Sequence, residues 1–192
     1  MKSDEKLIPV RDAHRFNESA LSEYLQNKME GYTGPLAVQQ FEGGQSNPTF
    51  LISCGGKKYV LRKKPPGKLL PSAHQVEREY RVMKTLEKTD VPVPEMLLLC
   101  EDDAVIGTPF FVMEYVHGRI LEDFRLPNQS PEERRAIYLD VVRVLAALHS
   151  VNYADLGLDD FGKPGNYFRR QIGRWSKQYV AAKTDEIESM ER

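Results

Sequence analysis

The stretch FEGGQSNPTF, residues 41–50, joins two adjacent glycines to small polar residues, between two short apolar runs. Glycine lets a backbone approach a ligand closely, so such a segment can hold exposed N–H groups against a phosphate. A plain surface turn has much the same composition. The choice between an anion-binding loop and a turn therefore depends on the charged residues that the fold places beside it.

Two nearby segments carry charges of the right kind. The run YVLR ends in Arg62, and the segment EREYRVM offers Glu77 and Glu79. In a nucleotide site, a cation on a strand contacts the phosphates while a carboxylate from a helix holds that cation. Glu79 is the better candidate, because Tyr80 and Met83 beside it belong to the apolar face. Taken singly, however, an Arg on a strand is usually solvated, and a Glu on such a helix is usually on its wet face or weakly paired with a neighbouring Arg.

The elements that would position these residues follow from capping, turn and periodicity signals. Asn17 caps a first helix, which the segment GYTGP stops. Three antiparallel strands are predicted at 36–41, 49–54 and 58–63, and Gly55 and Gly56 mark a hairpin between the last two. A helix over 73–87 follows, with Ser72 and Gln75 as a capping box, and two more strands lie in VPVPEMLLLCE and TPFFVMEYV.

No helix separates each pair of strands, so a doubly wound fold is excluded. The pattern predicts an α+β fold with a five-stranded antiparallel sheet and one helix after the third strand, the order of the small lobe of protein-kinase-like folds. The predicted organisation is a polar N-terminal arm (1–15), the first helix and small lobe (16–116), an interlobe linker (117–129) and a partial helical large lobe (130–192).

The last third of the chain is predicted to be helical. Ser130, Pro131 and Glu133 form a capped helix start. The first of these helices carries a core-facing apolar stripe at helical spacing; it consists of Ile137, Val141, Val144, Leu145 and Leu148. A final helix carries Phe168, Ile172, Trp175 and Tyr179 on one face.

Composition restricts the partners. The formal net charge is −1, which gives no general attraction to nucleic acid or to anionic membranes, and no run is long and apolar enough to span a bilayer. The N-terminus resembles neither a secretory signal nor a transit peptide. Cys54 and Cys100 lack metal-binding spacing, so two reduced thiols in a reducing intracellular compartment are expected. The oligomeric state stays open.

Several runs together resemble one family. GGQSNPTFLI, YVLRKKPPG, EREYRVMKTLEKTDVPVPEMLLLCED, VIGTPFFVMEYVHGRI and LAALHSV closely resemble the aminoglycoside phosphotransferase-like domain at the N-terminus of acyl-CoA dehydrogenase family members 10 and 11, with the closer match to member 11. The resemblance covers roughly residues 14–182.

The resemblance implies an ATP site with Mg²⁺. Arg62 would replace the usual third-strand lysine, with Glu79 as its partner. A loop over the phosphates would comprise Gly43, Gly44, Gln45, Ser46 and Asn47. The hinge that hydrogen-bonds adenine would comprise Met113, Glu114, Tyr115 and Val116. From the residues alone, the run FVMEY is equally typical of a buried strand.

The catalytic half of such a site is missing from the sequence. None of the four histidines begins the HGDxxxxN pattern that supplies the catalytic base in this family. The run DDFG at 159–162 imitates a magnesium motif, but no catalytic loop precedes it, so a turn-rich connector is favoured. Asp155, Asp159 and Asp160 lack the calcium-loop pattern. No catalytic or metal residue is therefore assigned, and the chain is expected to be a truncated product, either a short isoform or a partial gene model.

Two functions remain open at this stage. The first is the nucleotide-binding part of a kinase that, in the full-length protein, phosphorylates a small hydroxylated substrate of hydroxyacyl-CoA type. The resemblance couples this step to FAD-dependent dehydrogenation in fatty acid β-oxidation, in peroxisomes or mitochondria, although the short chain could also reside in the cytosol. This chain alone would be inactive. The alternative is a non-catalytic, pseudokinase-like binding module that engages a partner through exposed apolar surface.

Overall fold

The computed structural model describes residues 6–43, 47–67, 74–185 and 189. The chain divides into two compact units between Val151 and Asn152. The elements of the first unit are β1 (Leu7–Ile8), η1 (Asp12–His14), α1 (Glu18–Lys28), β2 (Ala37–Phe41), β3 (Thr49–Cys54), β4 (Lys57–Lys63), α2 (Val76–Leu86), β5 (Met96–Cys100), α3 (Asp103–Ile106), β6 (Phe110–Glu114) and α4 (Pro131–His149). The second unit contains α5 (Tyr167–Ala182).

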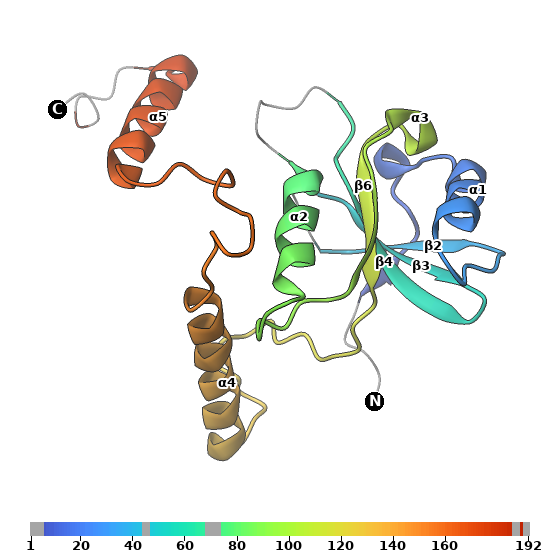
Figure 1. Cartoon of the computed structure of the whole chain (residues 1–192), viewed down its shortest axis with the longest axis horizontal. Helices are drawn as coiled ribbons and strands as arrows, with labels where there is room; N and C mark the ends of the chain where they lie inside the picture. The colour runs from blue at the N-terminus through green and yellow to red at the C-terminus, as the bar shows by residue number, and fades with distance from the viewer. Residues whose placement is uncertain (1–5, 44–46, 68–73, 186–188, 190–192) are drawn as a thin grey trace. The chain divides into compact units, whose positions relative to one another are not determined.

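The sheet is antiparallel throughout, in the order β1-β2-β3-β4-β6-β5. Figure 1 labels four of its strands, β2, β3, β4 and β6. The α+β class is confirmed, but the prediction of five strands is wrong, because the described residues form a sheet of six. The additional strand, β1, lies in the arm that was expected to be merely polar, where Leu7 pairs with Phe41. A strand of two residues is too short to show the alternation from which strands are recognised.

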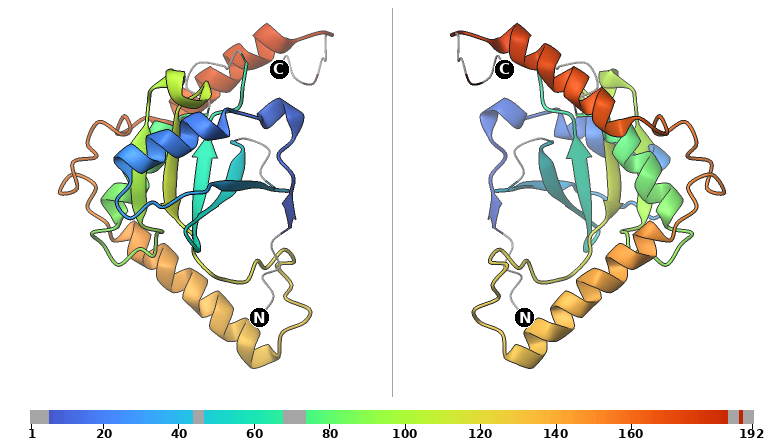
Figure 2. Two further views of the ribbon diagram at one scale, coloured as in Figure 1. Left: turned by 90° about the vertical axis from the view of Figure 1, so that its right-hand side faces the viewer. Right: turned by 90° about the vertical axis from the view of Figure 1, so that its left-hand side faces the viewer.

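The two faces of the sheet carry different layers. On one face, Phe50, Ile52 and Leu61 pack with Leu21 and Leu25 of α1 in the main core. Helix α3 lies next to α1, as Figure 2 also shows. On the other face, Phe111 packs against Val76 of α2. Alternate residues of each strand point to opposite faces, so the same strands build both layers.

The beginnings of the helices match the capping signals in part. Asn17 caps α1 by accepting a hydrogen bond from the N–H of Ala20 at 3.0 Å, as predicted. Helix α2 begins only at Val76, and the side chain of its N-cap Gln75 makes no capping bond. Ser72, the other half of the predicted capping box, lies outside the described residues. The short helix α3, capped by Asp102, was not predicted, because four residues are too few to show a helical period.

The predicted hairpin at Gly55 and Gly56 is confirmed. The two glycines connect β3 to β4, and both have a positive φ, of 54° and 78°. A Cβ at Gly55 would lie 1.9 Å from Thr33 Oγ1 and 3.1 Å from the carbonyl oxygen of Thr33. A Cβ at Gly56 would meet nothing within 4 Å. Only Gly55 therefore combines a left-handed backbone with a close approach.

We expect Gly55→Ala to lower the free energy of unfolding by about 2–4 kcal/mol, since it combines left-handed strain with overpacking. Gly56→Ala is the matched control, because it imposes the strain alone and should cost only about 1–2 kcal/mol. Urea denaturation of both variants measures the difference. Equal destabilisation would show that the contact with Thr33 does not constrain the hairpin.

The capped start of α4 is confirmed, but the expected burial of its apolar stripe is not. Ser130 and Glu133 form a complete capping box, and Pro131 occupies the first turn. Neither α4 nor α5 has a buried residue. Val141, Leu145 and Leu148 of α4 are exposed, as are Phe168, Ile172 and Trp175 of α5. Periodicity indicates which face of a helix is apolar, but not whether anything covers that face.

Among the helices that the structure describes, none has the length and hydropathy needed to cross a membrane.

Candidate functional site

The predicted ion pair between Arg62 and Glu79 is present. Arg62 Nε donates to Glu79 Oε2 at 2.6 Å, which joins β4 to α2. The Arg62 and Glu79 side chains keep 28% and 36% of their surface exposed. A guanidinium donates through several N–H groups, so a partly exposed Arg that is held on one side can still receive an anion on the other. The pair therefore presents an oriented positive charge at the edge of α2.

Other polar groups hold the guanidinium in place. Arg62 Nη1 donates to Thr49 Oγ1 at 3.0 Å and makes a longer contact of 3.5 Å with the carbonyl oxygen of Asn47. Thr49 lies directly opposite Arg62 in the β3–β4 ladder. Thr49 was not predicted, although the hairpin register derived from the glycine pair could have identified it.

The phosphate-loop prediction is only partly covered by the structure. Gly43 is exposed and lies two residues after the end of β2. Gly44, Gln45 and Ser46 lie outside the described residues. Asn47, the last residue of the predicted loop, is buried, and its Nδ2 donates to Glu79 Oε1 at 2.8 Å. The first residue of the predicted loop therefore lies close to the end of β2, and its last residue, Asn47, contacts the Arg62–Glu79 pair.

A pocket of about 420 Å³ adjoins the predicted hinge. Its lining residues are Phe41, Val60, Pro92, Val93, Pro94, Met113, Glu114, Tyr115 and Val116. All four predicted hinge residues, from Met113 to Val116, therefore contact one cavity. The chain leaves β6 after Glu114, and no backbone hydrogen bond of Val116 occurs within the described residues, so its polar groups can serve a bound base.

Strand β4 connects this pocket to the ion pair. Val60 and Arg62 are two residues apart on one strand, so their side chains project from the same face of the sheet. Val60 lines the pocket, while Arg62 pairs with the carboxylate from α2. An apolar cavity and an oriented cation therefore lie along the same strand, on one face of the sheet. Val60 was not predicted as a site residue, but the alternation from Arg62 identifies it.

Two lysines follow Arg62 and behave differently. Lys64 Nζ lies 2.9 Å from Glu77 Oε2, so the second carboxylate of α2 has a partner of its own. Lys63 points to the opposite face, where the residue is only 2% exposed and its ammonium lies 5.7 Å from the centre of the Phe16 ring. Burial lowers the pKa of Lys63 from its usual 10.5. Lys63 therefore belongs to the core rather than to the candidate site.

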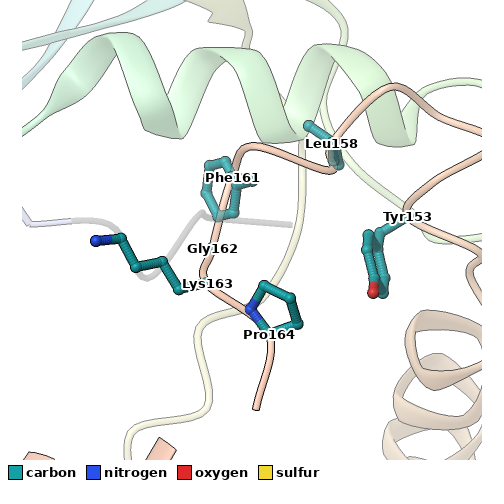
Figure 3. Close-up of a pocket in the computed structure, with 6 residues that line it drawn as sticks. All are labelled: Tyr153, Leu158, Phe161, Gly162, Lys163 and Pro164. Carbon is teal, nitrogen blue, oxygen red and sulfur yellow. The ribbon is translucent and has the colours of Figure 1, made fainter. Parts of the chain in front are cut away.

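The run at 159–162 forms part of a different hollow, within the second unit (Figure 3). The pocket is mostly apolar and has a volume of about 370 Å³; its lining residues are Tyr153, Leu158, Phe161, Gly162, Lys163 and Pro164. Within the described part of the chain, no group of three or more His, Cys, Asp or Glu side chains is arranged to hold a metal ion. The structure therefore offers no described residues through which a metal step can be derived.

Comparison with known proteins agrees with this geometry. The family model for phosphotransferase enzymes (APH) matches residues 37–192, which include every strand of the site and both helical segments that follow. The chain belongs to the phosphotransferase enzyme family. The described arrangement of β2, β3, β4, α2 and β6 is thus the family's kinase-like small lobe.

Individual relatives support the same assignment. The chain is 49% identical to acyl-CoA dehydrogenase family member 10 from Mus musculus, over 96% of this chain and 17% of that protein. It is also 49% identical to member 11 from Gallus gallus, over 94% of this chain and 24% of that protein. The chain thus spans a quarter or less of these curated relatives. Member 11 from Mus musculus is 44% identical to the chain, against 49% for member 10 from the same species, so the expected closer match to member 11 is not confirmed.

A solved structure is similar over most of the chain. A crystal structure described as an aminoglycoside phosphotransferase, from Ralstonia eutropha JMP134, superposes with a TM-score of 0.76 at 51% sequence identity. The match covers 92% of this chain and 51% of the other. The identity and the superposition together confirm the kinase-like fold that the order of elements predicted.

Proposed function

We propose that this phosphotransferase-family chain binds ATP, with the base in the pocket at Met113–Val116 and the phosphates beside Arg62. The observation that carries the proposal is the placement of that pocket and the Arg62–Glu79 pair on one sheet face. Arg62 neutralises phosphate charge, and Glu79 orients the guanidinium. The apolar lining from Phe41 and Val60 excludes water from the face of the base that would lie against the sheet.

The described residues suit a nucleotide better than they suit a metal ion. The pocket volume and apolar lining suit a nucleotide base, and the partly exposed guanidinium suits a phosphate. Mg²⁺ prefers carboxylate oxygens, and the described residues offer no cluster of three acidic or other ligating side chains. We therefore propose no role for Mg²⁺ at the described residues. FAD is proposed only for a full-length protein of this kind.

For such a longer protein, we propose ATP-dependent phosphorylation of a small hydroxylated substrate of hydroxyacyl-CoA type, coupled to acyl-CoA dehydrogenation in fatty acid β-oxidation. The names of the relatives support the dehydrogenase part. The 192 residues themselves contain no HGDxxxxN run to orient a nucleophile. We therefore propose that this chain binds nucleotide without transferring the phosphoryl group. Cys54 and Cys100 are buried and unpaired, which suits a reducing compartment such as the peroxisome, mitochondrion or cytosol.

The base pocket can be tested separately from the phosphate site. We expect Val60→Phe to fill part of the pocket and weaken ATP binding about tenfold, a loss of about 1.4 kcal/mol. Binding of inorganic triphosphate should stay unchanged, because Arg62 is untouched. Isothermal titration calorimetry with both ligands measures the two effects. Unaltered ATP affinity in this variant would rule out the pocket at Met113–Val116 as the base site.

The exposed apolar faces of α4 and α5 favour a second candidate, a non-catalytic binding module. Thermal melting separates the two functions, because ATP raises Tm only if it binds the folded chain. A rise in Tm that is lost in Arg62→Ala supports nucleotide binding. An unchanged Tm at millimolar ATP, together with a stable protein complex in pull-downs, supports the binding module.

A further inference from the structure

Both ends of the Asn47 side-chain amide, at the end of the predicted phosphate loop, have a partner: one end contacts Glu79 of the ion pair and the other contacts His74. The Asn47 Nδ2 lies 2.8 Å from Glu79 Oε1, and the Asn47 Oδ1 lies 2.9 Å from His74 Nδ1. The Asn47 residue is only 2% exposed. Buried amides are costly when either end lacks a partner, so both contacts constrain the position of Asn47.

The chemistry of these contacts fixes the direction of each hydrogen bond. The Glu79 carboxylate can only accept, so the amide must turn its NH₂ group toward Glu79. The Asn47 oxygen then faces the His74 ring and needs a donor, so His74 Nδ1 must carry a proton. Both the imidazolium and the neutral Nδ1–H tautomer satisfy this requirement, whereas the Nε2–H tautomer does not.

The backbone of His74 adopts an unusual conformation beside this contact. Its φ is 58°, in the left-handed region that non-glycine residues seldom occupy. The carbonyl of His74 accepts a hydrogen bond from the N–H of Val76, the first residue of α2, at 3.0 Å. His74 is thus held immediately before the helix that carries Glu79, with its ring directed at Asn47.

We propose that His74 is a positioning residue for the nucleotide site. It acts through Asn47, whose amide orients the Glu79 carboxylate, and Glu79 in turn orients the guanidinium of Arg62. The chain His74–Asn47–Glu79–Arg62 couples the end of the phosphate loop to the cation that receives the phosphates. The effect on affinity rests on the proposed function, whereas the hydrogen-bond chain itself does not.

Three substitutions at residue 74 separate a hydrogen-bond role from a role in packing. Asparagine and aspartate have the same shape and both tolerate a left-handed backbone, but only asparagine can donate to Asn47 Oδ1. We expect His74→Asn to keep ATP affinity within about twofold of the unchanged protein, which is below about 0.5 kcal/mol. His74→Asp and His74→Ala should weaken ATP binding about tenfold, or about 1.4 kcal/mol. Calorimetric titration with ATP gives the affinities.

Nuclear magnetic resonance provides a readout that does not depend on nucleotide. The ¹⁵N shifts of the His74 ring should show a protonated Nδ1 in the neutral state. The Arg62 Nε–H resonance should move in His74→Ala and stay in place in His74→Asn. A neutral Nε2–H tautomer, or an Arg62 resonance that is indifferent to both variants, would overturn the proposal even in a folded protein.

Nucleotide binding and the positioning role of His74 can be disproved independently of each other. If the unchanged protein does not bind ATP, the proposed function fails, while the tautomer and the Arg62 resonance still decide whether the hydrogen-bond chain exists. If the unchanged protein binds ATP and His74→Ala binds it equally well, the positioning role of His74 is wrong and the nucleotide site stands.

Discussion

Arg62→Ala is expected to weaken ATP binding about 100-fold, equivalent to about 2.7 kcal/mol. The substitution removes the guanidinium that would meet the phosphates, and hydrogen bonds between charged groups are about twice as strong as those between neutral ones. It also leaves the Glu79 carboxylate without its 2.6 Å partner, facing the incoming anion. Calorimetric titration of the variant with ATP measures the loss.

Lys64→Ala is the matched control for this experiment. The Lys64–Glu77 pair also joins the region of β4 to α2, and its side chains are comparably exposed, at 21% and 29%. Removing Lys64 therefore imitates the loss of a strand–helix ion pair without removing the proposed phosphate ligand. ATP affinity should change less than about threefold, as partly exposed ion pairs contribute little. If both variants bind ATP equally weakly, Arg62 has no special role.

Lys63→Met is expected to raise the free energy of unfolding at pH 7 by about 1–3 kcal/mol, because methionine removes a charge that burial disfavours. The Lys63 ammonium contacts the face of Phe16, and no hydrogen bond or ion pair to it occurs in the described part of the chain. Methionine retains the apolar stem and removes the charge. Urea denaturation of the two proteins measures the gain.

The pH dependence of this gain has a definite sign. Burial lowers the pKa of Lys63 in the folded protein below 10.5, its value when unfolded. Between these two values the unfolded chain binds more protons, so the stability of the unchanged protein rises with pH. The advantage of Lys63→Met should therefore be largest well below the lowered pKa and shrink as the pH approaches 10.5. Lys177→Met, at an exposed position of α5, is the control and should show neither effect. A pH-independent gain in Lys63→Met would contradict the buried charge.

The central pairing of the site could be predicted because local sequence patterns define both partners. The hairpin glycines place Arg62 on the third long strand, and the helical period distinguishes Glu79 from Glu77. The structure confirms the pair, with Glu77 engaged by Lys64 instead. The pocket was predicted only through Met113–Val116, since its other lining residues come from β2, β4 and the loop before β5, which are distant in the sequence.

The remaining contributions to the site depend on long-range contacts. Asn47 and His74 are 27 residues apart and share no periodic pattern, so nothing local indicates that they touch. The strand β1 and the burial of Lys63 likewise depend on which segments pack together. The exposure of the apolar stripes of α4 and α5 follows the same rule, because amphipathicity is a property of one helix and burial requires a second surface.

The sequence by itself determined the order of the five longer strands and of the longer helices, the caps of α1 and α4, the Gly55–Gly56 hairpin and the identity of the cation and its carboxylate. These features depend on residues that are neighbours along the chain or on one helix face, where hydrogen bonding and side-chain period act locally. Only the tertiary structure decided that Asn47 and His74 support that carboxylate, and that Val60 and the hinge enclose one cavity. Such contacts arise when the sheet and α2 pack, and packing joins residues without regard to their separation in sequence.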